Sequence, residues 1–450
     1  MQAVHHHFLL TMADLGLGKV VMVKDKLNAI LSKLGFNRRM MVQFLVLSIG
    51  SQTIFCFQAI RSVLYDPFIN TLGVNNTQFG ILMSLTGLGV LFSAVLGYVQ
   101  NRIDPRLLIT FGLLANGICV LIISGSPSYP VLLVVFGIMG FQSMGIFWPA
   151  VMGMVRRVAA DDHQGTAFGF LEMIRRATEL LQNMLAVAVF TVIGATLGIK
   201  VAMVISAIMM IIMAALNFFV LPKEDHAGET SEYRNKKAIS DLFLVLKMPQ
   251  VWLVGVTAAG IYASFVGLQF FLPFLNSVFV LPVLAGAIFG LVNTSVTGMI
   301  ASPVSGVLAD NVFKSPMRYL KLLLALLAIG VFVLLVLPRD QAMLYVTIGL
   351  LICLSFLLYL GRGVYYAPIG EMKIPKEISG GAMAVAAFIG YSPMFFAYAI
   401  YGYQMDNFSP ETAFNRIFMI MLGFACIGFV SSYLLNHKYG KAKVGSRIEA

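Results

Sequence analysis

Long apolar stretches separated by short polar segments run through nearly the whole chain of 450 residues. A helix that crosses a membrane needs about 20 consecutive, mostly apolar residues. Twelve stretches meet this requirement, at 40–64, 77–100, 105–125, 130–155, 164–194, 197–221, 250–275, 281–309, 318–337, 342–369, 378–402 and 412–436. The pattern therefore predicts an all-α membrane protein with twelve transmembrane helices.

The composition agrees with this pattern and excludes other classes of protein. Apolar residues make up 59% of the chain and charged residues only 11%, whereas soluble proteins average about 25% charged residues. These values exclude a soluble enzyme and a disordered chain. The four cysteines, Cys56, Cys119, Cys353 and Cys426, lie far apart within apolar stretches. We therefore expect them to be buried apolar residues and not a disulfide framework.

Lysine and arginine are distributed unevenly between alternate loops. If both termini are cytoplasmic, the cytoplasmic segments hold 24 of the 31 basic residues, and the opposite loops hold only Lys200, Arg339 and Arg416. This positive-inside asymmetry predicts cytoplasmic termini and an even number of spans. The net charge of +11 is dispersed between apolar stretches, so it does not indicate a nucleic-acid partner. We expect a multi-pass protein of a bacterial inner membrane.

The longest polar interruption, Pro222 to Gln250, divides the spans into six and six. The predicted organisation is a cytoplasmic N-terminal segment with an amphipathic helix, a six-helix bundle, a cytoplasmic linker, a second six-helix bundle and a basic cytoplasmic tail. These parts cover 1–37, 38–221, 222–249, 250–436 and 437–450, respectively. Residues 20–34 and 237–247 have apolar residues at helical spacing and are predicted to be helices at the membrane surface.

Short sequences recur between the two halves at a nearly fixed offset. Pro67-Phe68-Ile69-Asn70 follows the first span, and Pro273-Phe274-Leu275-Asn276 follows the seventh. Further pairs in chain order are Gly80 with Gly286, Gly97 with Gly306, Pro149 with Pro368, and Gly165 with Gly380. The halves are therefore predicted to be duplicated, pseudo-symmetric bundles, an arrangement in which the substrate site lies between them.

The loop between the eighth and ninth spans contains a recognisable motif. Gly306-Val307-Leu308-Ala309-Asp310, followed by Arg318, resembles the signature of the major facilitator superfamily. The equivalent stretch of the first half begins with Gly97 and continues to Asn101-Arg102, with Asn101 where the family usually has aspartate. The resemblance implies the major facilitator fold, with gating residues Gly97, Asn101, Arg102, Gly306, Asp310 and Arg318. Glycine there would let two helices approach closely.

Three further stretches are similar to the organophosphate antiporter branch and to bacterial organic-anion permeases. They are residues 101–106 (NRIDPR), 147–149 (FWP) and 165–169 (GTAFG). Members that carry phosphate esters pair an arginine of span one with an arginine of span seven. Arg61 lies near the first position, but Val251 to Leu275 contains no arginine. The incomplete arginine pair therefore argues against a phosphate ester and toward an organic anion that is singly charged or held differently.

The fifth span contains four charged residues at membrane depth, where a charged side chain costs several kcal/mol unless it is paired or hydrated. They are Glu172, Arg175, Arg176 and Glu179. The spacing predicts two i,i+4 ion pairs, Glu172 with Arg176 and Arg175 with Glu179. One hypothesis is that an arginine faces a central cavity and binds an anion, while Glu172 or Glu179 carries a proton. The alternatives are self-neutralised pairs that only stabilise the bundle, or a surface helix.

Two more arginines lie in apolar spans. Arg362 is flanked by glycines and followed by Tyr365 and Tyr366, so it is a second candidate for binding an anion. The alternative is a structural arginine that bonds Glu371 or helix-end carbonyls on the cytoplasmic side. Arg61 is the weaker candidate, because it lies near the end of its span, where it can extend to water. Arginine suits carboxylate or sulfonate because its planar fork bonds two oxygens.

Polar and amphipathic residues in other spans complete the predicted substrate site. Trp148, Gln269 and Tyr391 are candidates for the cavity wall, and Pro393 predicts a bend after Tyr391-Ser392. Other polar residues of the spans that are candidates are Gln58, Gln142, Tyr262, Asn293, Thr294 and Ser392.

Motifs for ATP binding, zinc hydrolysis and thiol redox chemistry are absent from the sequence. We therefore expect no enzyme, no cofactor and no metal site. The predicted function is secondary active transport of a small organic anion by alternating access, by a monomer coupled to a proton or to exchange. Two alternatives remain open: efflux of hydrophobic compounds, given the 26 methionines and 35 phenylalanines, and a transporter-like sensor that signals through cytoplasmic partners.

Overall fold

The computed structural model describes residues 37–90, 103–158, 164–223, 244–372, 374 and 376–440. Within these residues every regular element is a helix. The two amphipathic helices predicted at the membrane surface lie outside the described residues, except that residues 244–246 form a single helical turn. We call residues 37–223 the N-terminal half and residues 244–440 the C-terminal half.

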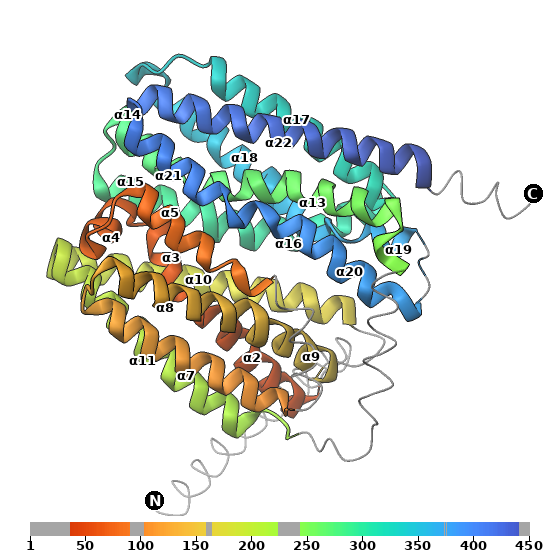
Figure 1. Ribbon diagram of the computed structural model, residues 1–450, viewed down its shortest axis with the longest axis horizontal. Coiled ribbons are helices and arrows are strands. Elements are labelled where there is room, and N and C mark those ends of the chain that lie inside the picture. The colour runs from red at the N-terminus through yellow and green to blue at the C-terminus, as the bar shows by residue number, and fades with distance from the viewer. Residues whose placement is uncertain are drawn as a thin grey trace, which may run out of the picture.

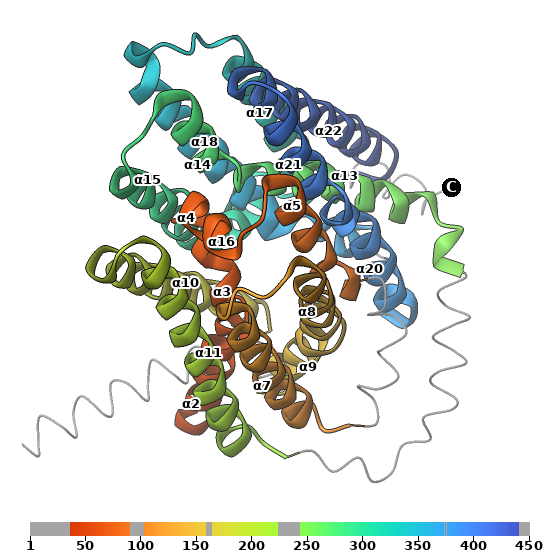
Figure 2. The same cartoon turned by 60° about the vertical axis from the view of Figure 1, so that its left-hand side comes forward.

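Helices of the N-terminal half pack side by side, as Figures 1 and 2 show in red to yellow-green. In chain order they are α2 (Arg38–Thr53), α3 (Cys56–Ala59), η1 (Ile60–Ser62), α4 (Tyr65–Leu72), α5 (Asn76–Leu85), α7 (Pro105–Ser124), α8 (Tyr129–Gln142), η2 (Ser143–Phe147), α9 (Trp148–Val158), α10 (Gln164–Ile193) and α11 (Ala195–Val220).

Helices of the C-terminal half form the second group, which is green to blue in both views. They are α13 (Pro249–Leu268), α14 (Phe271–Phe279), α15 (Val283–Gly290), η4 (Leu291–Val296), α16 (Thr297–Val307), η5 (Leu308–Val312), α17 (Pro316–Val336), η6 (Gln341–Met343), α18 (Leu344–Val364), α19 (Pro368–Glu371), α20 (Lys376–Tyr391), η7 (Ser392–Phe395), α21 (Ala397–Asn407) and α22 (Pro410–Tyr439).

Ten helices of the described chain are long and apolar enough to cross a membrane, or up to eleven if the bent pair Arg38–Thr53 and Cys56–Ser62 is one span. The span predicted at 77–100 is described only as far as residue 90. The prediction of many membrane-spanning helices is therefore confirmed, and the count of twelve stays a prediction.

Local sequence explains where many of these helices begin. Pro105, Pro249, Pro316 and Pro410 each occupy the first helical turn, where proline costs no hydrogen bond because its missing N–H has no partner there. Pro393 lies in the short 3₁₀ helix η7, which separates α20 from α21. The α-helix is therefore interrupted after Tyr391, and the bend predicted there stays a prediction.

Large apolar side chains cover the outer surface of both halves. Val134, Phe219 and Ile329 are more than half exposed, which suits a surface that faces hydrocarbon. Cys56 and Cys119 are buried as predicted, but Cys353 and Cys426 are exposed on this surface. Burial was the wrong expectation for these two, since a cysteine in a lipid-facing helix needs no protein neighbours.

The two halves meet closely at one end of the molecule, which we call the sealed end and define by residues 66–76, 276–282 and 406–410. Here α5 packs against α21 and α4 against α14. A methyl group on Gly80 would clash with the carbonyl of Tyr398, and one on Gly402 with the carbonyl of Asn76. Only glycine permits this approach of backbone to backbone.

Side chains also join the halves at the sealed end. Asp406 accepts hydrogen bonds at the first turn of α5, from the backbone N–H groups of Asn76 (3.2 Å) and Thr77 (2.6 Å). Asn276 donates to Asp66 over 2.8 Å. Asn276 ends one of the repeated Pro-Phe sequences, and Asp66 immediately precedes the other, so the repeat places equivalent segments in contact.

Candidate functional site

A cavity of about 700 Å³ lies between the two halves. It extends toward the opposite end of the molecule, which we call the linker end and define by residues 103–105, 221–223 and 313–316. Both halves contribute to its lining, which is Trp148, Phe170, Glu172, Met173, Arg175, Arg176, Ser302, Pro303, Gly306, Val307, Asn311, Tyr359, Arg362, Gly363, Tyr365 and Tyr391.

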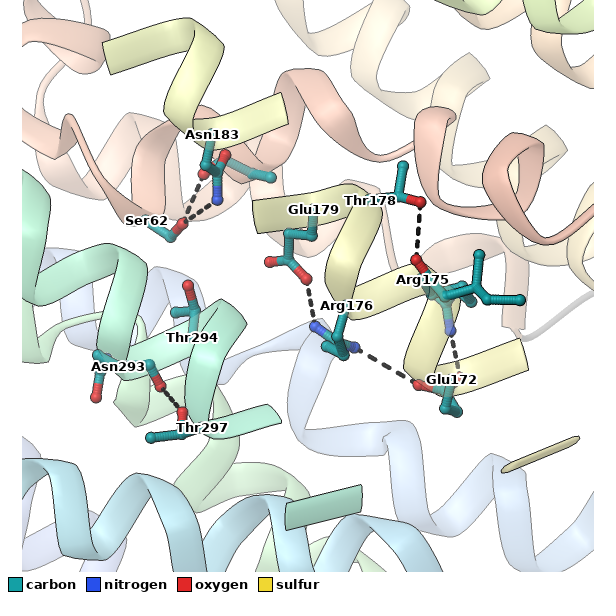
Figure 3. A network of polar contacts seen from close by, with 12 residues as sticks. Ser62, Glu172, Arg175, Arg176, Thr178, Glu179, Asn183, Asn293, Thr294 and Thr297 are labelled. Atoms are coloured by element: carbon teal, nitrogen blue, oxygen red, sulfur yellow. Dashed lines mark hydrogen bonds and ion pairs between the residues drawn. The ribbon is translucent and has the colours of Figure 1, made fainter. Parts of the chain in front are cut away.

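Helix α10 carries a row of four charged side chains (Figure 3), of which Glu172, Arg175 and Arg176 line the cavity. Arg175 Nη1 lies 2.5 Å from Glu172 Oε1. Arg176 forms an ion pair with Glu179, and its Nη2 atom lies 3.9 Å from Glu172 Oε2. Arg176 therefore lies between two carboxylates, and Arg175 has one.

This pairing differs in part from the expected one. The Glu172–Arg176 pair is present, but the predicted Arg175–Glu179 pair is wrong, because Arg176 takes Glu179 as its partner. A helix of 3.6 residues per turn brings both i+3 and i+4 neighbours within reach. Arg175 turns toward Trp148, with its guanidinium carbon 4.5 Å from the ring, and this places it beside Glu172 instead.

Aromatic rings support the arginines of α10. Trp148 lies beside Arg175, and the ring of Tyr359 lies 5.4 Å from the guanidinium carbon of Arg176. Tyr359 belongs to α18, so this contact joins the two halves across the cavity wall. A cation over a ring face is attracted by the ring quadrupole, by about 0.5–2 kcal/mol depending on exposure.

Arg362 is the arginine that the C-terminal half contributes to the cavity. Its guanidinium carbon lies 3.9 Å from the ring centroid of Phe265 and 5.7 Å from that of Tyr262. Within the described chain it has no carboxylate oxygen within 4.0 Å. The alternative bond to Glu371 is wrong, because that carboxylate accepts from Ser315 Oγ (2.6 Å) and the backbone N–H of Met317 (3.1 Å).

Two of the predicted tyrosines lie together at the cavity. The hydroxyls of Tyr365 and Tyr391 are 2.9 Å apart, and both residues line the cavity. Tyr366 packs against both of their rings but is not part of the lining. Helix η7 begins directly after Tyr391, so this hydroxyl pair links the end of α18 to the point where α20 ends.

Other predicted site residues lie outside the lining. Glu179 is held behind Arg176, and Gln269 ends helix α13. Arg61 is 8% exposed and donates from Nη2 to the hydroxyl of Tyr398 over 3.0 Å. The expectation that Arg61 extends to water is therefore wrong, because the C-terminal half covers it.

Half of the predicted gating motif lies within the described residues. Gly97, Asn101 and Arg102 lie outside the described residues. Gly306 lines the cavity, and a Cβ there would meet no atom within 4 Å, so it does not provide the close helix approach that we expected. Asp310 lies in η5, with a side chain outside the described part, and Arg318 is exposed in the first turn of α17.

Several lining residues were not predicted from the sequence. Phe170, Met173, Pro303 and Tyr359 lie in apolar stretches where nothing distinguishes them from core residues. Tyr359 had one available signal, since it precedes Arg362 by three residues and so shares its helix face. Within the described residues no group of three His, Cys, Asp or Glu side chains is placed to hold a metal ion.

Comparison with known proteins places this chain among membrane transporters. The sequence profile of the Major Facilitator Superfamily matches residues 46–398. Inner membrane protein YihN of Escherichia coli (strain K12) is 29% identical over 407 residues, which cover 89% of this chain and 96% of that protein.

Solved structures agree on the fold. A bacterial homologue of the human lysosomal transporter Spinster, in an inward-facing and unoccupied conformation, has a TM-score of 0.69 at 14% identity and covers 90% of this chain and 98% of its own. The nucleoside transporter NupG has a TM-score of 0.64 at 14% identity, with 88% of this chain and 99% of its own covered. At these identities the likeness concerns the fold alone.

Proposed function

The chain belongs to the Major Facilitator Superfamily, and from this premise we propose that it is a secondary active transporter of a small organic anion that works by alternating access. The supporting observation is that both halves contribute arginines to one cavity. Arg175 and Arg176 come from α10, and Arg362 comes from α18 on the opposite side. An anion bound between them would hold the halves together.

The chemistry of these side chains favours an oxyanion. A guanidinium stays charged at all physiological pH values and offers parallel N–H donors that match a carboxylate or sulfonate. Phe265 covers one face of the Arg362 guanidinium, so the N–H groups at its edge are free to donate to a ligand. Tyr365 and Tyr391 add hydroxyl groups to the same wall.

The two halves are in contact at the sealed end, whereas the cavity between them extends toward the linker end, and alternating access would exchange these two arrangements. If the linker end is cytoplasmic, as the distribution of basic residues predicts, the cavity lies toward the cytoplasm in this conformation and the sealed end faces the other side. Glu172 lines the cavity and is the carboxylate that we assign to proton coupling, if transport is not by exchange.

Binding of the purified protein to small compounds tests this proposal. Thermal unfolding would be measured with carboxylates and sulfonates and with neutral amides and primary amines of equal size. We expect the anions alone to raise the melting temperature, because a ligand stabilises the state that it binds. Arg362→Ala should weaken anion binding roughly a hundredfold, because it removes a charge-assisted bidentate contact.

Arg416→Ala is the matched control, since Arg416 stacks on Phe408 outside the cavity, and it should bind anions as the unaltered protein does. If neutral or cationic compounds raised the melting temperature, and still did so in Arg362→Ala, this result would contradict the proposal. It would favour efflux of hydrophobic compounds. Anion binding without counterflow in proteoliposomes would favour a sensor.

A further inference from the structure

The charges around the cavity do not cancel. Three guanidinium groups, those of Arg175, Arg176 and Arg362, face or line it, and two carboxylates, Glu172 and Glu179, pair with the first two. One positive charge is therefore in excess among the described side chains of this site. It resides on Arg362, which lacks a carboxylate within 4.0 Å in the same part of the chain.

Arg61 does not change this count. It also lacks a carboxylate partner in the described chain, but it is not part of the lining, and the hydroxyl of Tyr398 accepts one of its N–H groups. The ring of Tyr398 also lies 4.9 Å from its guanidinium carbon. The charge of Arg61 is thus held on the side of the sealed end and is not presented to a ligand in the cavity.

An uncompensated charge is unfavourable in surroundings of low dielectric constant, and its cost falls when an opposite charge enters. A ligand with one negative charge brings the site to neutrality. A ligand with two negative charges leaves an excess negative charge between Glu172 and Glu179. Resting on the proposed function, we infer that the site selects singly charged carboxylates or sulfonates over dianions, and that Glu172 sets this selectivity.

Glu172 has this role because of where its carboxylate lies. Its side chain is 35% exposed and lines the cavity, whereas that of Glu179 is 9% exposed and sits behind Arg176. A ligand on Arg362 and Arg175 therefore meets the carboxylate of Glu172 first. The interaction between two like charges in a poorly solvated site is strong enough to discriminate between ligands.

Matched pairs of probes test the inference. Butyrate would be compared with succinate, and benzenesulfonate with phenyl phosphate, by thermal unfolding and calorimetry at a pH where the second member of each pair is a dianion. We expect the monoanion to bind at least about tenfold more tightly in each pair. In Glu172→Gln the excess positive charge of the site becomes two. The ratio of the affinity for the monoanion to the affinity for the dianion should therefore fall by about tenfold or more.

Glu411→Gln is the control, because Glu411 is an exposed carboxylate in the first turn of α22, away from the cavity, and it should leave the ratio unchanged. Dianions that bind the unaltered protein as tightly as monoanions would overturn the inference while the proposed function stands. Binding of neutral compounds and of neither anion class would overturn both. If Glu172→Gln does not fold, the ratio measured on the unaltered protein still decides.

Discussion

The sealed end and the cavity are two parts of the same interface between halves, and they use charge in opposite ways. At the sealed end, carboxylates bond across the interface: Asp406 to the start of α5 and Asp66 to Asn276. In the cavity, Glu172 and Glu179 bond to arginines three residues away on their own helix. The sealed end is therefore closed by the protein's own groups, whereas the charged walls of the cavity are left for a ligand to bridge.

The difference extends to packing. Next to the sealed end backbone lies against backbone at Gly80 and Gly402, so a small separation of the halves would break both of these contacts together. Around the cavity the contacts are between long side chains, which can rearrange while the backbone stays in place. We infer that the sealed end behaves as a two-state closure and the cavity as an adaptable site.

The largest effect should follow from filling a glycine of the sealed end. Gly402→Leu would push against the carbonyl of Asn76, and such overpacking costs about 3 kcal/mol. Separation of the halves at this end should therefore become favourable. Spin labels on Asn70 and Tyr345, exposed positions of opposite halves, would report a longer distance, in a background that lacks the exposed Cys353 and Cys426.

Gly349→Leu is the control for this substitution, because a Cβ atom there would meet no other atom within 4 Å. An unchanged distance distribution in Gly402→Leu, together with normal unfolding, would show that the close backbone approach does not keep this end shut.

Asp406→Ala should have a smaller effect of the same kind. The carboxylate accepts from four donors of α5, including the side chains of Asn76 (2.8 Å) and Thr77 (2.6 Å). It also carries negative charge at a helix N-terminus. Its loss should cost about 1–2 kcal/mol at this exposed position and raise the fraction of open molecules roughly tenfold.

Asp340→Ala gives a matched comparison, because Asp340 caps the short helix η6 within its own half. Its carboxylate accepts a hydrogen bond from the backbone N–H of Met343 over 3.1 Å. It should lower the melting temperature without changing the distance between the labels. If Asp340→Ala increased the distance between the labels as much as Asp406→Ala does, the loss of a helix cap would act by lowering the overall stability of the fold. It would then not act by weakening the interface between the halves.

The smallest effect is expected at the pair of Asp66 and Asn276. A single part-buried hydrogen bond of 2.8 Å contributes about 0.5–1.5 kcal/mol. A double-mutant cycle with Asp66→Ala and Asn276→Ala should give a coupling energy of that size in the opening equilibrium. Additive effects of the two substitutions would show that the repeated segments touch without stabilising each other.

Much of the fold was predictable because hydropathy acts locally. Helix α7 begins at Pro105 and ends at Ser124, and the sequence predicted a span at 105–125. The charged row of α10 was also visible, because a helix places residues three and four apart on one face. The choice between the i+3 and i+4 partners was not visible, since it depends on Trp148 and Tyr359, which other helices supply.

The sequence by itself determined that this chain is a membrane protein of apolar helices with arginines at membrane depth, since length, hydropathy and spacing along one helix are local properties. Tertiary structure alone decided which arginines face the cavity. It covered Arg61 with Tyr398, 337 residues away, and left Arg362 without a carboxylate in the described chain. Partners so distant in sequence are chosen by packing between helices, and no local pattern records that packing.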